Sequence, residues 1–318
     1  MGLFDGHPGY KPFQYPWAYE AWLEHEQMHW LFAEVPLADD IEDWNHSLTE
    51  SEKNLMTQIF RLFTQSDVEV ENAYIDLYMP KFKPVEIRMM LAGFAARESI
   101  HQASYSYLLD SIGMPESEYG AFLKYSEMSD KVDYLKNFNM NNPHNTALSM
   151  AVFGAFTEGL QLFASFAMLL NFPRFNKMKG MGQIITWSVR DESKHVESII
   201  KLYHTLLSET PGIDIKSLHE DITEACRQIV INEDAFISLA FGLGPVQGMT
   251  PENVMEYIRF IANMRLSQLG IEPIYDVPRN PLPWIDEMLN AVEHANFFEN
   301  RATEYSKAAT DGTWADVF

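Results

Sequence analysis

Two stretches of the chain have the spacing of a buried helix but carry a glutamate and a histidine inside the apolar stripe. The first stripe is Leu91, Phe94, Glu98, His101, Tyr105 and Leu108. The second is Ile185, Ser188, Glu192, His195, Ile199, Leu202 and Leu206. Residues three and four apart share one face of a helix, so both Glu-x-x-His pairs are predicted to point into a core.

A third pair, Glu26 and His29, has the same spacing but lies in the polar run EHEQMH. It has no apolar stripe around it. We therefore interpret this pair as a surface feature, because Glu-x-x-His by itself is weak evidence for a metal site.

Each buried pair is preceded by a carboxylate on another predicted apolar face. Asp67 continues the stripe of Phe60, Phe63, Val70 and Tyr74, and Glu158 lies with Ala155, Leu162 and Phe166. Glu71, one turn from Asp67, is an alternative candidate. One carboxylate from each of two helices and Glu-x-x-His from each of two others is the ligand set of bundle proteins that bind two iron or manganese ions.

Charge explains why such a set indicates metal. Four carboxylates bring −4 into an apolar interior, and each uncompensated one costs several kcal/mol or takes up a proton. Two divalent cations balance this charge. Carboxylates mixed with imidazole suit iron or manganese better than the thiolate sites that select zinc or copper. The alternative is a set of core polar residues satisfied by hydrogen bonds.

Helical periodicity dominates the whole chain. It predicts an all-α fold with helices near 15–33, 51–79, 84–112, 118–137, 145–171, 180–209, 214–242 and 250–269. Proline, glycine and asparagine separate them. The stretch DVPRNPLPW is too rich in proline for a helix, and the last segment is polar. We expect one helical domain, 1–302, and a flexible C-terminal tail, 303–318.

Composition narrows the function. The 318 residues carry a formal net charge of −22, which disfavours binding to nucleic acid. A single cysteine, Cys226, fits a reducing cytoplasm, and no signal peptide is expected. Residues 147–170 are long and apolar enough to span a bilayer, but Glu158 lies in their middle. We expect a central bundle helix and no membrane segment.

The chain resembles the radical-generating small (beta) subunit of class I ribonucleotide reductase. The resemblance is carried by WLFAEVPLADD, SDVEVEN, ARESIHQASY, TEGLQLFASF, VRDESKH, NPLPW and FFENRATEY. It implies a ferritin-like bundle, a homodimer, and a site for two iron or manganese ions. The implied ligands are Asp67, Glu98, His101, Glu158, Glu192 and His195, so the resemblance favours Asp67 over Glu71.

The resemblance also implies roles that spacing does not supply. Tyr105 matches the tyrosyl radical position, and Trp30 and Asp191 match the internal relay. Tyr305 matches the tail tyrosine that passes the radical to the large (alpha) subunit, where ribonucleotides are reduced. The segment after Tyr305 ends in WADVF, which we interpret as a docking peptide for that subunit.

Two residues depart from what the resemblance leads us to expect. Ser188 puts a hydroxyl near Tyr105, and Lys194 puts a charge between Glu192 and His195. Some members of the family keep the oxidising equivalent on the metals, and the sequence leaves both storage sites open. The alternative function is a ferritin-like dimetal oxidase or monooxygenase.

Overall fold

The protein is described by a computed structural model, which describes residues 2–288, and most of these residues are helical. The described part of the chain contains no β-strand, only a single bridge between Val246 and Met249. The all-α fold is therefore confirmed. The α-helices are α1 (Pro16–Gln27), α2 (Ala38–Glu42), α3 (Glu50–Asn72), α4 (Met79–Lys81), α5 (Val85–Ser111), α6 (Ser126–Leu135), α7 (Pro143–Met150), α8 (Leu162–Leu170), α9 (Lys179–Glu209), α10 (Ile215–Ala240) and α11 (Pro251–Gln268).

Several of these helices are joined by π-helical segments, in which the backbone is wound more widely. The π-helical segments are η2 (Asp43–Ser47), η3 (Ala73–Tyr78) and η6 (Ala151–Gln161). As a result α3, η3 and α4 run as one continuous element, and so do α7, η6 and α8. Short 3-10 turns cover Phe32–Glu34, Glu116–Glu118, Ala121–Lys124 and Pro173–Phe175.

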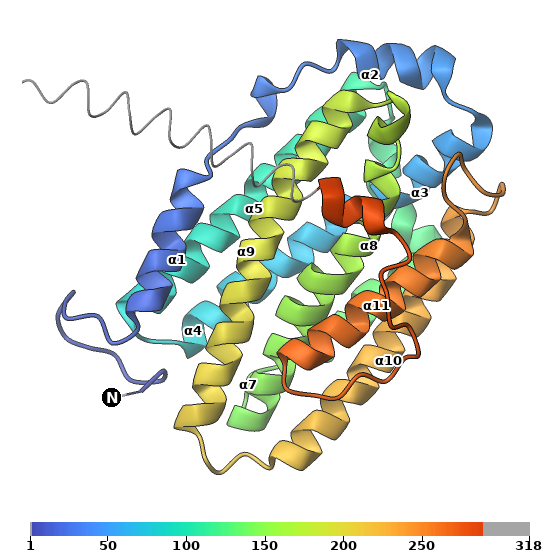
Figure 1. The fold of residues 1–318 in the computed structure, drawn as a ribbon. Helices are drawn as coiled ribbons and strands as arrows, with labels where there is room; N and C mark the ends of the chain where they lie inside the picture. Colours follow the sequence, from blue (N-terminus) through green and yellow to red (C-terminus); the bar gives the residue numbers. More distant parts are fainter. Residues whose placement is uncertain (1, 289–318) are drawn as a thin grey trace, which may run out of the picture. The chain divides into compact units, whose positions relative to one another are not determined.

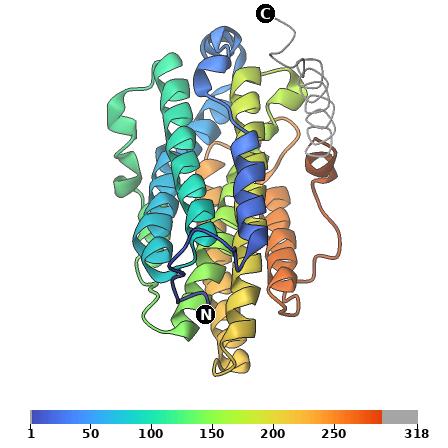
Figure 2. The ribbon, with the colours of Figure 1, turned by 90° about the vertical axis from the view of Figure 1, so that its left-hand side faces the viewer.

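Long helices packed side by side form the core of the unit that spans Met1–Pro281. Helix α5 packs against α1, α3 and α9, while α9 also packs against η6 and α8 (Figures 1 and 2). Helices α10 and α11 pack against each other and against η6. Helix α3 packs against α5 and η6, and α9 also packs against α5 and η6, so the inward faces of these four elements enclose one shared interior.

The apolar segment Pro143–Phe175 is the central helix of this core. Its most hydrophobic stretch is long enough to cross a membrane, but it is completely buried within the protein. A side chain at Gly154 would meet Ile199 of α9, because an added Cβ would lie only 2.4 Å from that residue. The small residue lets α9 and η6 approach closely. The expected central bundle helix is thus confirmed.

Helix α9, which carries Glu192 and His195, is held at its N-terminus by a residue far away in the sequence. The buried carboxylate of Asp40 in α2 accepts hydrogen bonds from the amides of Gly180 (2.8 Å) and Met181 (2.7 Å). These are among the amides that a helix leaves without partners in its first turn, and a negative charge there also favours the helix dipole. Asp40 therefore fixes both the start and the position of α9.

Two predicted helices are shorter than the sequence suggested. The helix expected over 15–33 ends at Gln27, and residues 28–37 leave the α-helical path. The carbonyl of Met28 accepts hydrogen bonds from Arg97 and Arg190, which satisfy the end of α1 from neighbouring helices. The first part of the helix expected over 118–137 is not α-helical. After Gly120 the chain forms the 3-10 turn Ala121–Lys124, and the α-helix begins only at Ser126.

The chain divides into two units, Met1–Pro281 and Leu282–Phe318. In the second unit the structure describes residues 282–288, of which 283–288 are helical. The predicted boundary between 302 and 303, the tail 303–318 and Tyr305 lie outside the described residues.

Replacing the carboxylate that caps α9 is expected to destabilise the protein. Asp40→Ala removes two hydrogen bonds to helix amides, and caps of this kind contribute about 1–2 kcal/mol. Urea unfolding followed by circular dichroism measures the change. Asp39→Ala is the matched control, because Asp39 is exposed in the same helix. Equal stability of the two variants would show that Asp40 does not hold α9.

Candidate metal centre

Six acidic and histidine side chains from four helical elements meet in the interior of the bundle. Asp67 comes from α3, Glu98 and His101 from α5, Glu158 from η6, and Glu192 and His195 from α9. None of the six exposes more than 1% of its surface. The spacing of three residues places each Glu and His of a pair on one face, and both faces turn inward as predicted.

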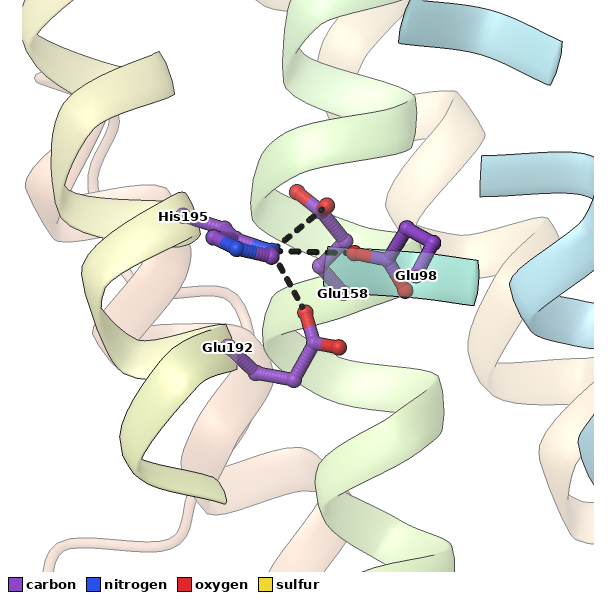
Figure 3. Close-up of side chains that lie close together, drawn as sticks. All are labelled: Glu98, Glu158, Glu192 and His195. Atoms are coloured by element: carbon purple, nitrogen blue, oxygen red, sulfur yellow. Dashed lines mark ion pairs between the residues drawn. The ribbon is translucent and has the colours of Figure 1, made fainter. Parts of the chain in front are cut away.

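The six residues form two overlapping groups of potential ligand atoms. The first group is Glu98, Glu158, Glu192 and His195, and the second is Asp67, Glu98 and His101. Within each group the ligand atoms lie within 4.8 Å of one another. Figure 3 shows the first group, with the three carboxylates directed at the ring of His195. The rival candidate Glu71 lies outside both groups and accepts hydrogen bonds from Ser99 and Gln102.

Two carboxylates connect the two histidines. Glu98 places Oε1 at 3.0 Å from Nδ1 of His195 and Oε2 at 3.3 Å from Nδ1 of His101. Glu192 does the same with Oε2 at 3.3 Å from His195 and Oε1 at 3.1 Å from His101. Each carboxylate thus offers one oxygen to each histidine, the arrangement by which carboxylates bridge a pair of metal ions.

The donor atoms of this cluster fit metal ions better than they fit hydrogen bonds. Both oxygens of Asp67 are buried without a hydrogen-bond partner in the described structure, and Nδ1 of His195 faces Glu98, Glu158 and Glu192 at once although it can carry only one proton. Buried polar atoms in proteins nearly always have partners, so this set calls for another group. Oxygen and imidazole donors are those preferred by iron and manganese.

The pKa values of the cluster show that it carries an excess of negative charge. Burial raises the pKa of Asp67, and nearby Glu98 raises it further. Burial also raises the pKa of Glu158, to about 8. Burial alone would lower the pKa of His101 and His195, but hydrogen bonds and charges of the surrounding carboxylates raise it instead. The protein groups alone therefore hold extra protons, which divalent cations would displace.

A hydrogen-bonded chain leads from this cluster to Trp30. The indole Nε1 of Trp30 donates to Oδ2 of Asp191 at 2.7 Å. The same oxygen lies 3.3 Å from Nε2 of His101, whose other ring nitrogen faces Glu98 and Glu192. The rings of Trp30 and His101 are stacked, with centroids 6.0 Å apart. Three residues from three separate segments thus form one continuous path.

Tyr105 lies beside the cluster, on the side of Asp67 and His101. Its ring is buried against Phe63, with centroids 4.4 Å apart, and lies 6.5 Å from the ring of His101. Its hydroxyl donates to Oγ of Ser188 at 3.0 Å. Burial raises the pKa of Tyr105, and the charge of Asp67 adds to this shift. The phenol is therefore held protonated in the protein interior.

The comparisons with known proteins agree with this geometry. A family model described as "Ribonucleotide reductase, small chain" matches residues 9–281. A protein of Invertebrate iridescent virus 6, named as a ribonucleoside-diphosphate reductase small subunit, is 41% identical over 356 aligned residues. That alignment covers 100% of this chain and 99% of the relative. The chain belongs to the ribonucleotide reductase small-chain family.

Other relatives of the family cover most of the chain as well. The beta subunit of Chlamydia pneumoniae ribonucleoside-diphosphate reductase is 30% identical, over 93% of this chain and 89% of the relative. The R2 subunit of ribonucleotide reductase from Clostridium botulinum superposes with a TM-score of 0.83 at 21% identity, over 90% of this chain and 93% of that one. Streptococcus sanguinis dimanganese(II)-NrdF gives 0.75 at 20% identity, over 86% and 95%.

Membership in the family confirms the predicted function and enzyme class. The chain is the small subunit of a ribonucleotide reductase, an oxidoreductase subunit whose partner is a large subunit. The solved structures share its helical bundle, which confirms the ferritin-like fold. Nothing in the comparisons favours the alternative of a separate dimetal oxidase or monooxygenase.

The two departures noted in the sequence have clear places in this small subunit. Ser188 is the residue that accepts the hydrogen bond of Tyr105. Lys194 points away from the cluster, where it pairs with Glu24 and Glu197 on the outer side of α9. The charge between Glu192 and His195 in the sequence therefore does not enter the core. Glu26 and His29 are both exposed, as predicted.

Sequence reasoning missed two residues that touch the cluster. Nε2 of His25 lies 3.1 Å from Nε2 of His195, and the ring of His25 is fully buried. Tyr74 donates its hydroxyl to Oε1 of Glu158 at 2.5 Å. A signal for His25 existed, because Ala18, Ala21 and His25 make a buried stripe with steps of three and four residues. The polar run around His25 concealed that stripe.

A third missed residue, Arg97, supports the relay. Its guanidinium is buried and donates to Oδ2 of Asp191 at 3.0 Å, and it also binds the carbonyls of Met28 and His25. Burial would raise the pKa of Asp191, but His101, Arg97 and Arg190 together lower it well below the usual range. Asp191 is therefore a stable anion between Trp30 and His101.

Removing this buried cation is expected to destabilise the fold strongly. Arg97→Met keeps an unbranched side chain but removes the guanidinium and leaves Asp191 with less compensation, and breaking a buried ion pair costs about 3–5 kcal/mol. Urea unfolding measures the loss. Arg227→Met is the control, since Arg227 forms an exposed ion pair with Glu224 whose contribution is small. If Asp191→Asn removes the penalty of Arg97→Met, the interaction with Asp191 is its source; a penalty that persists contradicts this assignment.

Proposed function

We propose that the chain binds two metal ions, iron or manganese, through Asp67, Glu98, His101, Glu158, Glu192 and His195, and that it supplies an oxidising equivalent to the large subunit. The observation that carries this proposal is the bridging arrangement of Glu98 and Glu192 between the two histidines. When bound as a pair, such ions would supply a one-electron oxidant for a tyrosine. The dimanganese of the Streptococcus sanguinis neighbour supports manganese as one candidate.

In this proposal Tyr105 stores the oxidising equivalent. Its phenol is buried beside the cluster and protected from water, which suits a long-lived radical. The hydroxyl of Ser188 is the nearest hydrogen-bond acceptor for the phenolic proton. Family members that store the equivalent on the metals provide the alternative, and Ser188 is the residue by which this chain departs from the expected apolar lining.

The relay proposed for transfer to the large subunit runs through His101, Asp191 and Trp30 to Tyr305. The described contacts make each of the first steps short, at 3.3 Å and 2.7 Å. When Trp30 gives up an electron, the ionised carboxylate of Asp191 is in place to hold its Nε1 proton. Tyr305 lies outside the described residues, and its part in the relay rests on the family resemblance.

A single substitution distinguishes the two storage sites. Tyr105→Phe should leave two metal ions per chain, because Tyr105 is not a ligand, while abolishing a tyrosyl EPR signal and ribonucleotide reduction. EPR and metal analysis of protein reconstituted separately with iron and manganese provide the measurement. Survival of activity together with a metal-centred signal would assign storage to the metals and exclude Tyr105.

We also propose how the subunit assembles. The tail 303–318 is polar but ends in the apolar residues Trp314, Val317 and Phe318, a form that suits a peptide that becomes ordered on binding. It would dock to the large subunit. The resemblance also implies a homodimer, and the single cysteine, Cys226, fits a location in the cytoplasm. The burial of Pro143–Phe175 supports a core helix in place of a membrane span within residues 2–288. The net charge of −22 disfavours nucleic acid as a partner.

Truncation after Lys307 tests the docking role of the tail. Because the apolar end is removed and Tyr305 is retained, affinity for the large subunit should be lost while the EPR signal and metal content stay unchanged. Surface plasmon resonance against the large subunit measures binding, and Thr310→Ala is the control within the tail. A synthetic peptide of the last sixteen residues, 303–318, should compete with the full chain. Undiminished affinity of the truncated protein would rule out docking by this segment.

A further inference from the structure

Glu158 differs from the other carboxylates of the cluster because a side chain outside the proposed ligand set holds it. The hydroxyl of Tyr74 donates to its Oε1 at 2.5 Å, and both residues are 1% exposed. The oxygens of Asp67 have no hydrogen-bond donor in the described structure, and those of Glu98 and Glu192 face only the histidines of the cluster. Among the carboxylates of the six residues, Glu158 is thus the one that accepts a hydrogen bond from Tyr74.

Glu158 is also the carboxylate that needs such support. Glu98 and Glu192 each face both histidines, so both of their oxygens are constrained by the bridging arrangement. Glu158 faces only His195, with Oε1 at 3.6 Å from Nδ1. A glutamate held at one end has several rotamers available, and the hydrogen bond from Tyr74 selects the one that keeps Oε1 beside His195.

The fold brings Tyr74 to this position with unusual backbone. Tyr74 lies in the π-helical segment η3, and Glu158 lies in the π-helical segment η6. π-Helical segments are rare in proteins, and those that occur often lie at functional sites. The ring of Tyr74 packs edge-on against His195, Phe94 and Tyr78, with centroids 6.0, 6.0 and 5.4 Å away. Tyr74 is therefore fixed by its surroundings before it contacts Glu158.

We propose that Tyr74 is a positioning residue for Glu158, and that its hydroxyl sets the affinity of the metal position formed by Glu98, Glu158, Glu192 and His195. The proposal rests on the ligand set proposed above. Groups that orient a ligand from behind typically contribute a factor of about 10–100 to metal affinity. The position formed by Asp67, Glu98 and His101 has no contact with Tyr74 among those described, so its affinity should not depend on the hydroxyl.

The chain contains a matched control four residues further on. Tyr78 is a buried tyrosine in the same segment, and its hydroxyl has no hydrogen-bond partner in the described structure. Tyr74→Phe and Tyr78→Phe each remove one buried hydroxyl and keep the ring. Only the first removes a bond to Glu158, so any difference between them reports that bond rather than packing.

The test is a titration of full-length, chelator-treated protein with manganese(II) chloride, in which EPR measures the free ion. The wild-type protein and Tyr78→Phe should each bind two ions per chain. Tyr74→Phe should bind one ion as the wild type does and the other about 10–100-fold more weakly. Wild-type affinity of Tyr74→Phe at both positions would overturn the proposal.

A second pair of variants locates the effect. In a Glu158→Ala background, adding Tyr74→Phe should cause no further loss of affinity, because the hydrogen bond is already absent. An equal loss in that background would show a general structural effect and contradict positioning through Glu158. If the wild-type protein does not bind two ions, the proposed metal centre itself is refuted. If the wild-type protein binds two ions and Tyr74→Phe binds them equally well, only the role of Tyr74 is refuted.

Discussion

The burial of four carboxylates inside an apolar bundle is the constraint on which the rest of this structure depends. Each ionised carboxylate in such a place costs several kcal/mol unless a cation compensates it. The protein meets this cost with geometry: Glu98 and Glu192 face two histidines at once, and their oxygens converge where cations would lie. The surrounding helices must then be held in fixed register, since a small shift of one helix would separate the oxygens that belong together.

The register is secured from outside the cluster by charged side chains that cap helix ends. Asp40 accepts hydrogen bonds from the first amides of α9 and so sets the position of Glu192 and His195 along the axis of that helix. Arg97 reaches from α5 to the last carbonyls of α1 and to Asp191 in α9, which joins three elements at one point. Trp30 follows this end of α1 and donates to the same oxygen of Asp191 as Arg97 does. The same contacts of Arg97 therefore stabilise the fold and hold Asp191 of the proposed relay in place.

The sequence was informative where a property depends on local spacing and silent where it depends on contacts between distant segments. The helix expected over 84–112 is found at Val85–Ser111, and both Glu-x-x-His pairs are buried as predicted. The helix over 15–33 was predicted too long, because the arginines that satisfy its end come from α5 and α9. The bond of Tyr74 to Glu158 escaped for the same reason, since no spacing within one helix indicates which residue a neighbouring helix will present. His25 escaped because the polar run around it concealed the buried stripe that it forms with Ala18 and Ala21.

Two buried tyrosines flank the cluster, and their hydrogen bonds give them different chemical settings. Tyr74 is bound to the carboxylate of Glu158, so its hydroxyl is committed to a proposed ligand. Tyr105 is bound to the neutral hydroxyl of Ser188, which is not one of the six cluster residues, so this hydrogen bond holds no proposed ligand. Oxidation of a phenol breaks its O–H bond and so removes the hydrogen bond that it donates. A tyrosine whose hydrogen bond holds no proposed ligand can lose that bond and regain it with the carboxylates in place, which is a physical reason why Tyr105, and not Tyr74, serves for storage in the proposed mechanism.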